Sequence, residues 1–328
     1  VHVSRIMLSS ARFIMIQVIQ LLKAAECLRH TIHTDQMIDR LMTSTSCFPM
    51  LSVVIPALRL LIDLANIAKH TLYPTHVKMK RHERCITARL ASELYRARLS
   101  MINDTLWTII NALSSFPEMA HLSSPVALAL VFVGLTVDIC LLLYSYRIAR
   151  EAYDNKKRQY KDEITSMYPG MIPDMSHLQL LDLERCYCGT QSRLNLSLLA
   201  GSVILVGFSL LITAPIPILA PLGSLICLLG SSLYLTAEAY AHYEQQNFVF
   251  NHNKIQPKTT SANLAAAEKA KQDAWDNFVF HLITNVCFPI IVMSTLAASL
   301  PAALLLLIAL ITFKIQSPEP QPLLPLTH

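Results

Sequence analysis

The chain has 328 residues, of which 53% are hydrophobic and only 15% are charged, and its mean hydropathy is +0.42. A soluble globular domain carries about 25% charged residues, so this composition excludes an ordinary soluble enzyme. Seven glycines are too few for Gly-rich phosphate loops, and the low charge excludes an extended disordered chain. The expected fold class is all-α: a polytopic helical membrane protein with about three transmembrane hairpins and N-terminal amphipathic helices.

The N-terminal region, 1–47, is expected to form amphipathic helices. Within it, residues 6–28 carry polar side chains at a spacing of three, which indicates a helix that lies on the membrane or on other helices rather than crossing. The next stretch, 48–68, is apolar except for Arg59 and Asp63, and both a span and an interfacial helix stay open for it. Because Arg59 and Asp63 are four residues apart on one helical face, they can pair, and paired charges cost less in lipid than lone ones.

The first membrane region extends over 48–146 and contains a basic amphipathic helix at 69–105. Its clearest span is 125–146, which begins with a proline in its first turn and is interrupted only by Asp138. The apolar stretch 106–116 precedes it. We expect these two apolar segments to form a hairpin.

A second membrane hairpin is predicted at 194–238. Residues 194–237 contain no Asp, Glu, Lys or Arg. A straight helix of that length would measure roughly 66 Å, about twice a hydrocarbon core of roughly 30 Å. The run must therefore fold back, and Pro215 and Pro217 place the turn near its middle. Small residues on shared faces, Ser197/Gly201 and Gly223/Gly230, indicate close helix packing.

A third membrane hairpin is predicted at 277–314, with its turn at 299–301. The arm after Pro301 has only about 13 apolar residues, roughly 20 Å of helix, so it is either a thin span or a partial, re-entrant arm. A single tilted helix at 285–313 is the alternative. The tail, 315–328, is Pro-rich and expected to be disordered.

Basic residues mark the segments that are expected to face the cytosol. Residues 69–98 hold eight Lys and Arg, residues 147–161 hold six and residues 254–271 hold four. By the positive-inside rule these segments are cytosolic, which makes 147–193 a cytosolic basic loop and 239–276 a cytosolic segment. The predicted location is thus an integral membrane position with cytosolic basic loops.

Polar residues inside apolar helices are the candidate functional groups. Asp138 is either a proton or cation site, with Arg59 as one candidate partner, or a hydrogen-bonded structural aspartate. For the other polar groups, interhelical hydrogen bonding and a lined pathway both stay open. The intramembrane polar candidates are Asp138, Arg59, Asp63, Asn111, His281 and Asn285.

The basic segments also predict a contact with lipid headgroups. On the helix at 69–105, Ile86, Leu90, Leu94 and Ala97 share one face, the geometry of a helix lying among anionic headgroups. The expected partners are the lipid bilayer and its anionic lipids. A protein partner stays open, and nucleic acid is not expected. The headgroup candidates are Lys78, Lys80, Arg81, Arg84, Lys156, Lys157 and Arg158.

No catalytic motif is recognisable. The chain has no G-x-S-x-G, no Walker loop, no H-E-x-x-H and no paired-carboxylate motif in a soluble segment. The histidines His30 and His33 are not joined by a full ligand set at a standard spacing. We therefore expect no cofactor, no metal site and no catalytic residue.

Two stretches carry a resemblance to known proteins. One runs from the amphipathic helix ending Ile102-Asn103-Asp104 through the apolar span to Tyr-Asp-Asn-Lys-Lys-Arg-Gln-Tyr at 153–160, and the other is Ala-Trp-Asp-Asn-Phe at 274–278. The chain resembles uncharacterised multi-spanning membrane proteins of intracellular gammaproteobacteria, several of which are candidate type IV-secreted effectors. The resemblance implies residence in a membrane, including a host organelle membrane if the chain is secreted, and it transfers no catalytic residue.

Three functional hypotheses follow. The first is a non-enzymatic integral membrane protein that presents basic cytosolic segments as an interaction or effector surface. The second is a small-solute or ion transporter that uses Asp138. The third is a membrane enzyme without a recognisable motif.

Overall fold

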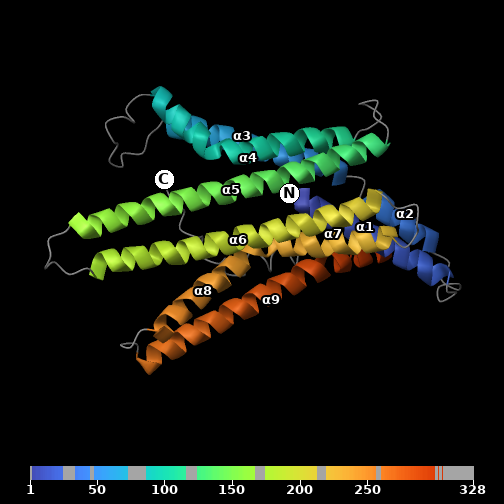
Figure 1. Ribbon diagram of the computed structural model, residues 1–328. Helices are drawn as coiled ribbons and strands as arrows, with labels where there is room; N and C mark the ends of the chain where they lie inside the picture. Colours follow the sequence, from blue (N-terminus) through green and yellow to red (C-terminus); the bar gives the residue numbers. More distant parts are fainter. Residues whose placement is uncertain are drawn as a thin grey trace. The chain divides into compact units, whose positions relative to one another are not determined.

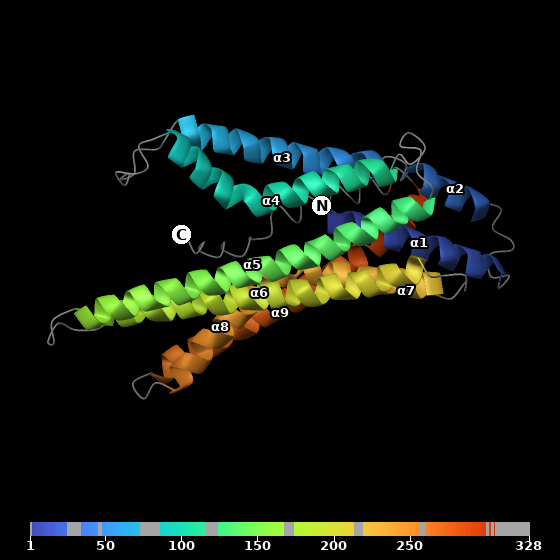
Figure 2. The same cartoon turned by 45° about the horizontal axis from the view of Figure 1, so that its top comes forward.

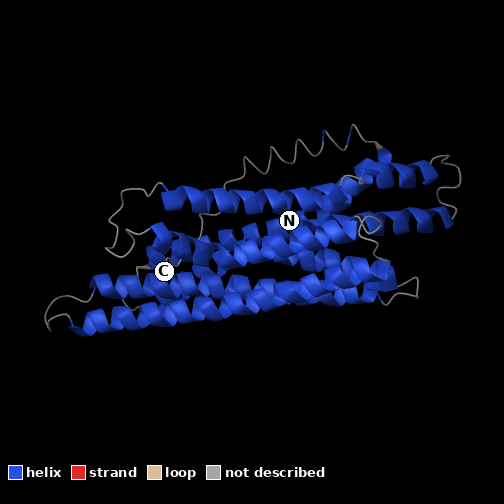
Figure 3. Ribbon diagram, turned by 90° about the horizontal axis from the view of Figure 1, so that it is seen from above, coloured by secondary structure: helices blue, strands red, loops and turns tan. Residues whose placement is uncertain are grey.

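The computed structural model describes residues 2–24, 34–44, 48–72, 86–115, 124–166, 174–212, 219–255 and 260–299, with 302 and 305 as single further positions. These residues are almost entirely helical and include no strand (Figure 3). The helices are α1 (His2–Ala24), α2 (Thr34–Ser44), α3 (Phe48–Leu72), α4 (Ile86–Ser115), α5 (Ser124–Ser166), α6 (Asp174–Ile212), α7 (Leu219–Leu235), α8 (Ala237–Ile255) and α9 (Ser261–Ala298) (Figure 1).

The predicted all-helical fold is confirmed for the described residues. Among the described residues, three helices are long and apolar enough to cross a membrane: Ala129–Asp162 within α5, Gln179–Ile212 within α6, and all of α9. Helices α7 and α8 pass the same test as a pair that is bent by 50°.

The chain divides into two compact units. The first comprises residues 1–6 and 42–141, and the second comprises residues 7–41 and 142–328. Helix α5 contributes its beginning to the first unit and its remainder to the second.

In the first unit, α3 and α4 lie side by side (Figures 1 and 2) and run antiparallel. Most residues of the buried stripe of α3 are small or polar, Ile67 being the exception, and most of its large apolar side chains point outward. Leu58, Leu61 and Ile62 are 52%, 61% and 59% exposed. The buried residues of this helix are Ser52, Pro56, Ile67 and Thr71.

In the second unit, α6 and α7 form an antiparallel hairpin (Figure 1). The two helices approach so closely that a Cβ added to Gly207 would lie 2.8 Å from the Gly223 carbonyl oxygen. One added to Gly230 would lie 3.0 Å from the Ile204 backbone nitrogen. The predicted packing through Gly223 and Gly230 is therefore confirmed, and its closest partner on α6 is Gly207.

The boundary between α7 and α8 is a bend at Thr236. The Thr236 backbone N–H is shared between the carbonyls of Ser232 and Leu233, and its hydroxyl donates to the same two carbonyls. Side-chain hydrogen bonds of this kind bend helices. The 50° change of direction thus arises without proline or glycine at the bend.

Two antiparallel helix pairs extend from the apolar part of the second unit. In the first polar hairpin, residues 147–166 of α5 lie along residues 174–193 of α6, and the rings of Tyr153 and Tyr187 stack with centroids 4.0 Å apart. The second polar hairpin pairs α8 with residues 261–276 of α9. Aromatic contacts join its helices: Tyr243 with Trp275 and Tyr240 with Phe278.

The N-terminal helices join the second unit at the far end of α9. Leu41 of α2 is fully buried with Ile19 of α1 and Ala297 of α9. The Arg40 guanidinium donates to the Ala298 carbonyl oxygen over 2.9 Å, which satisfies an acceptor that a helix end leaves open. The described N-terminal helices therefore pack on each other and on α9, which is one of the two alternatives predicted for 6–28.

The helix bounds differ from the predicted ones at the polar boundaries. The segment 147–193 is predicted as a cytosolic loop before a membrane hairpin that begins at 194, whereas α6 runs unbroken from Asp174 to Ile212. A helix propagates across a change in polarity as long as no residue breaks it.

The last membrane segment is described only in part. Helix α9 ends at Ala298, with Ser299 in an extended conformation, which agrees with the predicted turn at 299–301 and not with one helix over 285–313. The arm after Pro301 and the tail lie outside the described residues, apart from positions 302 and 305.

Candidate functional site

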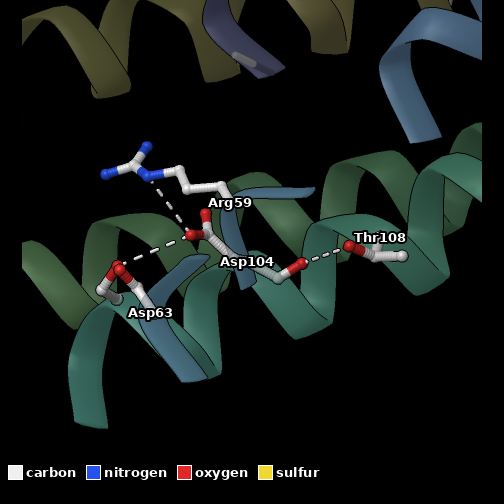
Figure 4. A network of polar contacts seen from close by, with 5 residues as sticks. Arg59, Asp63, Asp104 and Thr108 are labelled. Carbon is white, nitrogen blue, oxygen red and sulfur yellow. Dashed lines mark hydrogen bonds and ion pairs between the residues drawn. The ribbon is translucent and has the colours of Figure 1, made fainter. Parts of the chain in front are cut away.

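A network of polar side chains joins α3 to α4 (Figure 4). Arg59 Nε lies 3.4 Å from Asp104 Oδ2. Ser100 Oγ donates to Asp63 Oδ2 over 2.9 Å and lies 3.5 Å from Asp104 Oδ2. The Thr108 hydroxyl donates to the backbone carbonyl of Asp104 over 2.6 Å. The network thus contains one guanidinium, two hydroxyls and two carboxylates, of which the Thr108 hydroxyl bonds within α4.

Helix spacing explains why these side chains meet. Arg59 and Asp63 are one turn apart on α3, and Ser100 and Asp104 are one turn apart on α4. In the antiparallel pair, the residue nearer the start of α3 faces the residue nearer the end of α4. Arg59 consequently meets Asp104, and Asp63 meets Ser100.

Asp104 is the buried member of this network. Its side chain is 8% exposed, whereas that of Arg59 is 57% exposed. Asp104 lies outside the three described helices that are apolar enough to span a membrane. Burial raises the pKa of its carboxyl group. The charge of Arg59 opposes this rise, and the charge of Asp63 adds to it. Since a serine has one hydroxyl proton, Ser100 can donate to only one carboxylate at a time.

The predicted pairing of Arg59 with Asp63 needs correction. The ion pair of Arg59 is with Asp104, and Asp63 instead accepts a hydrogen bond from Ser100. The four-residue spacing allowed the local pair, but the neighbouring helix offers a buried carboxylate, where an ion pair is less screened by water.

Asp138 of α5 accepts a hydrogen bond from α4. The Trp107 indole Nε1 donates to Asp138 Oδ1 over 2.9 Å, and Trp107 is 2% exposed. A Cβ added to Gly134, one turn before Asp138, would lie 2.6 Å from Ile110 Cδ1. Glycine at this position therefore lets α5 approach the Trp107 side of α4. This geometry favours the structural alternative for Asp138.

The other polar candidates lie in both units. Asn111 is 1% exposed, and its Nδ2 donates to the Ser52 carbonyl oxygen over 2.9 Å, which is an interhelical hydrogen bond. His281 and Asn285 are half-buried on α9, and the His281 ring contacts that of Phe280. These two residues belong to the second unit, whereas the α3–α4 network belongs to the first.

The basic candidates divide between described and undescribed residues. Lys157 donates to Glu184 of α6 over 2.9 Å and to the Tyr153 hydroxyl over 2.8 Å. Its ammonium group therefore links the two helices of the first polar hairpin. Lys156 is half-buried and Arg158 is exposed. The candidates Lys78, Lys80, Arg81 and Arg84 lie outside the described residues.

The hydrophobic face predicted for the basic helix is largely exposed in the first unit. Leu90 is 39% exposed and Leu94 is 40% exposed, and Ala97 is half-buried. Ile86 begins α4. This exposure is compatible with the predicted headgroup contact.

Sequence reasoning did not single out Ser100 and Asp104 as site residues. A signal for them exists, because Ser100, Asp104, Trp107 and Asn111 follow one another at spacings of four, three and four, which is one helical face. A line of residues with hydrogen-bonding side chains along one helical face predicts a contact with a neighbouring helix. All four residues take part in contacts with α3 or α5.

No metal centre appears among the described residues, where no group of three or more His, Cys, Asp and Glu side chains is placed to hold an ion. Comparison with protein-family models, with curated proteins and with solved structures finds no match to this chain.

Proposed function

We propose that this chain is a multi-pass membrane protein that holds its two polar hairpins on the cytosolic side as a docking surface for protein partners. Support for the membrane position comes first from the packing of α7. Its buried residues are mostly small or polar: Gly223, Ser224, Cys227, Leu228, Gly230, Ser231 and Ser232. Its large apolar residues point outward, with Leu222, Leu225 and Leu229 44%, 44% and 43% exposed.

This packing is the reverse of a water-soluble helix bundle. In water, exposing large apolar side chains forfeits their burial energy of about 1.5–3 kcal/mol each. In lipid, large side chains face the acyl chains and small residues let helices approach. The same arrangement recurs in α3, where Leu61 is 61% exposed and Ser52 is buried.

The proposed spans are the apolar parts of the long helices. They are residues 125–146 of α5, 194–212 of α6, α7 itself and 277–298 of α9. Each has a length of roughly 25–33 Å as a helix, close to the hydrocarbon core of roughly 30 Å. The basic segments lie beyond one end of these spans, so the positive-inside rule places both polar hairpins in the cytosol.

The observation that carries the docking function is the continuity of α5, α6 and α9 with the polar hairpins. Helices that only cross a membrane need no ordered extension. Here the extensions are held by specific contacts: Lys157 with Glu184 in the first hairpin, and Arg193 with Glu238 between α6 and α8, at 3.3 Å. Ordered polar helices outside the bilayer favour a surface for other proteins.

The second candidate function is transport, and the α3–α4 network favours it. A buried carboxylate beside a second carboxylate and a guanidinium is an arrangement that proton-coupled transporters use. Against it stands the structural use of the other polar groups, since Asp138 accepts from Trp107 and Asn111 donates to Ser52.

Two experiments separate these functions. A photoreactive amino acid at Lys269, an exposed residue of the second polar hairpin, should give discrete protein adducts in native membranes. The matched control is the same amino acid at Leu222, which faces lipid in this proposal and should give lipid adducts alone. An absence of protein adducts from position 269 would contradict the docking function.

For transport, purified protein is reconstituted into liposomes. We expect proton and monovalent-cation fluxes equal to those of protein-free liposomes. A flux that is lost on Asp138→Asn or Asp104→Asn would instead establish the transporter.

A further inference from the structure

Helix α8 carries a half-buried histidine, His242, of which one ring nitrogen is buried. His242 Nδ1 is buried and has no hydrogen-bond partner among the described residues. The other ring nitrogen, Nε2, lies 3.4 Å from Gln246 Nε2 on the same helix. Around it the helices are tightly fitted, because Gln245 fills the space opposite Gly189, where an added Cβ would lie 2.5 Å from Gln245 Nε2.

The charged surroundings of His242 are unfavourable for an imidazolium. Arg185 of α6 is the cation whose field reaches the ring. On α8, Glu238 is held by Arg193 and Glu244 lies two residues beyond His242. From α9, the uncharged rings of Trp275 and Phe278 contact α8 at Tyr243 and Tyr240.

We propose that the α6–α8 contact is a proton-controlled joint, in which protonation of His242 loosens α8 from α6 and frees the second polar hairpin to change direction. A charged imidazole has two N–H donors, so protonation leaves buried Nδ1 as a donor without a described acceptor and adds a positive charge within the field of Arg185. The bend at Thr236 lies six residues before His242 and supplies the pivot.

The direction of the pH effect follows from the same burial. Burial lowers the pKa of His242, and Arg185 lowers it further. A base whose pKa is lower in the closed contact than in the open one binds protons preferentially when open. The contact is therefore fully stable above the ordinary histidine pKa of about 6.5 and weakens as the pH falls through the lower value of the closed form.

This joint rests on the proposed function, in which α8 lies outside the bilayer, and it adds a regulation: acidification of the cytosolic face would redirect one docking hairpin. The test needs neither a partner nor a bilayer. It can therefore fail while the docking function stands, and it can succeed if docking is disproved.

The test is amide hydrogen exchange by mass spectrometry on the full chain in detergent at pH 8 and pH 5.5, corrected for intrinsic exchange rates. We expect peptides covering 240–249 of α8 and 185–193 of α6 to exchange several-fold faster at pH 5.5. Peptides covering 197–212 should not change. An unchanged wild-type pattern at the two pH values would overturn the proposal without any variant.

Variants then assign the response to one ring. His242→Gln, which cannot gain a proton, should remove the pH response, and the matched control His252→Gln on the same helix should keep it. If His242→Gln does not fold, His242→Asn takes its place. A response that persists with a neutral residue at position 242 would also overturn the proposal.

Discussion

At the scale of single residues, two opposing effects act on Asp104 in the α3–α4 network. Burial raises the pKa of its carboxyl group, and the Arg59 guanidinium lowers it. The partner of Arg59 could not be predicted from the sequence, because the four-residue spacing to Asp63 and the contact across to Asp104 are both sterically allowed. Only the register of α3 against α4 decides between them. The interhelical bond of Asn111, in contrast, was predictable from its place in an apolar segment.

A double-mutant cycle tests the partner of Arg59. We expect Arg59→Leu and Asp104→Leu to be coupled, with an interaction energy of about 1 kcal/mol or less because Arg59 is largely exposed. The control cycle of Arg59→Leu with Asp63→Leu should give a smaller value, since these two side chains form no ion pair. Thermal unfolding in detergent at pH 7.5 supplies the free energies. A larger coupling energy in the control cycle would show that Arg59 pairs with Asp63 and not with Asp104.

The pKa of Asp104 gives a second prediction. Because this pKa is raised, the folded state binds the proton more tightly than the unfolded state does. The stability that Asp104 contributes is thus present below its unfolded pKa of about 3.9 and is lost as the pH rises through the folded value. Replacing the ionised carboxylate by a neutral amide should then stabilise the protein at pH 7.5.

We therefore expect Asp104→Asn to raise the unfolding temperature at pH 7.5 and to have less effect at pH 4, where the wild-type carboxyl group is closer to its protonated form. Asp63→Asn, at the less buried carboxylate, is the control. A loss of stability in Asp104→Asn at pH 7.5 would mean that the ion pair with Arg59 outweighs the burial of Asp104.

At the scale of helices, the α6–α7 hairpin is the element that sequence reasoning described best. Its turn was predictable because the charge-free run is about twice as long as a helix needs to cross the hydrocarbon core, and Pro215 and Pro217 interrupt it near the middle. The bend at Thr236 was not predictable in the same way. It depends on hydroxyl bonds to carbonyls one turn back, which Ser and Thr form in many straight helices as well.

The glycine contact of this hairpin gives a third prediction. A Cβ at Gly207 would meet backbone atoms of α7, which cannot move aside cheaply. Gly207→Val should destabilise the detergent-solubilised protein by about 1–3 kcal/mol, the usual cost of overpacking. Val206→Ala, at a neighbouring position that is 57% exposed, should leave stability nearly unchanged. Equal effects of the two changes would show that the helices are not in close contact there.

The first polar hairpin gives a fourth prediction. Glu184→Gln removes the charge that holds Lys157 and leaves the stacked rings of Tyr153 and Tyr187 in place. For half-exposed groups, the expected loss is about 0.2–1 kcal/mol, and it should shrink as salt is added. Thermal unfolding in low and high salt measures this loss. A loss that does not depend on salt would indicate that the effect is one of packing.

At the scale of the whole chain, composition and hydropathy were enough to predict an all-helical protein with membrane-length apolar helices. They were not enough to predict that α5, α6 and α9 continue as ordered helices far beyond their apolar parts. Hydropathy reports where a segment prefers to lie and carries no information on whether a helix stops at that boundary. The docking function proposed for the polar hairpins depends on that continuity and on the side of the membrane that they face.

The most direct test of this account is the labelling of single cysteines by a membrane-impermeant maleimide in intact, oriented vesicles, in a background without the native cysteines. Arg158→Cys and Lys269→Cys report the two polar hairpins, and Ile216→Cys reports the segment between α6 and α7. The account predicts that positions 158 and 269 are labelled from the cytosolic face and that position 216 is labelled only from the opposite face or not at all. Labelling of positions 158 and 216 from the same face of intact vesicles would contradict it.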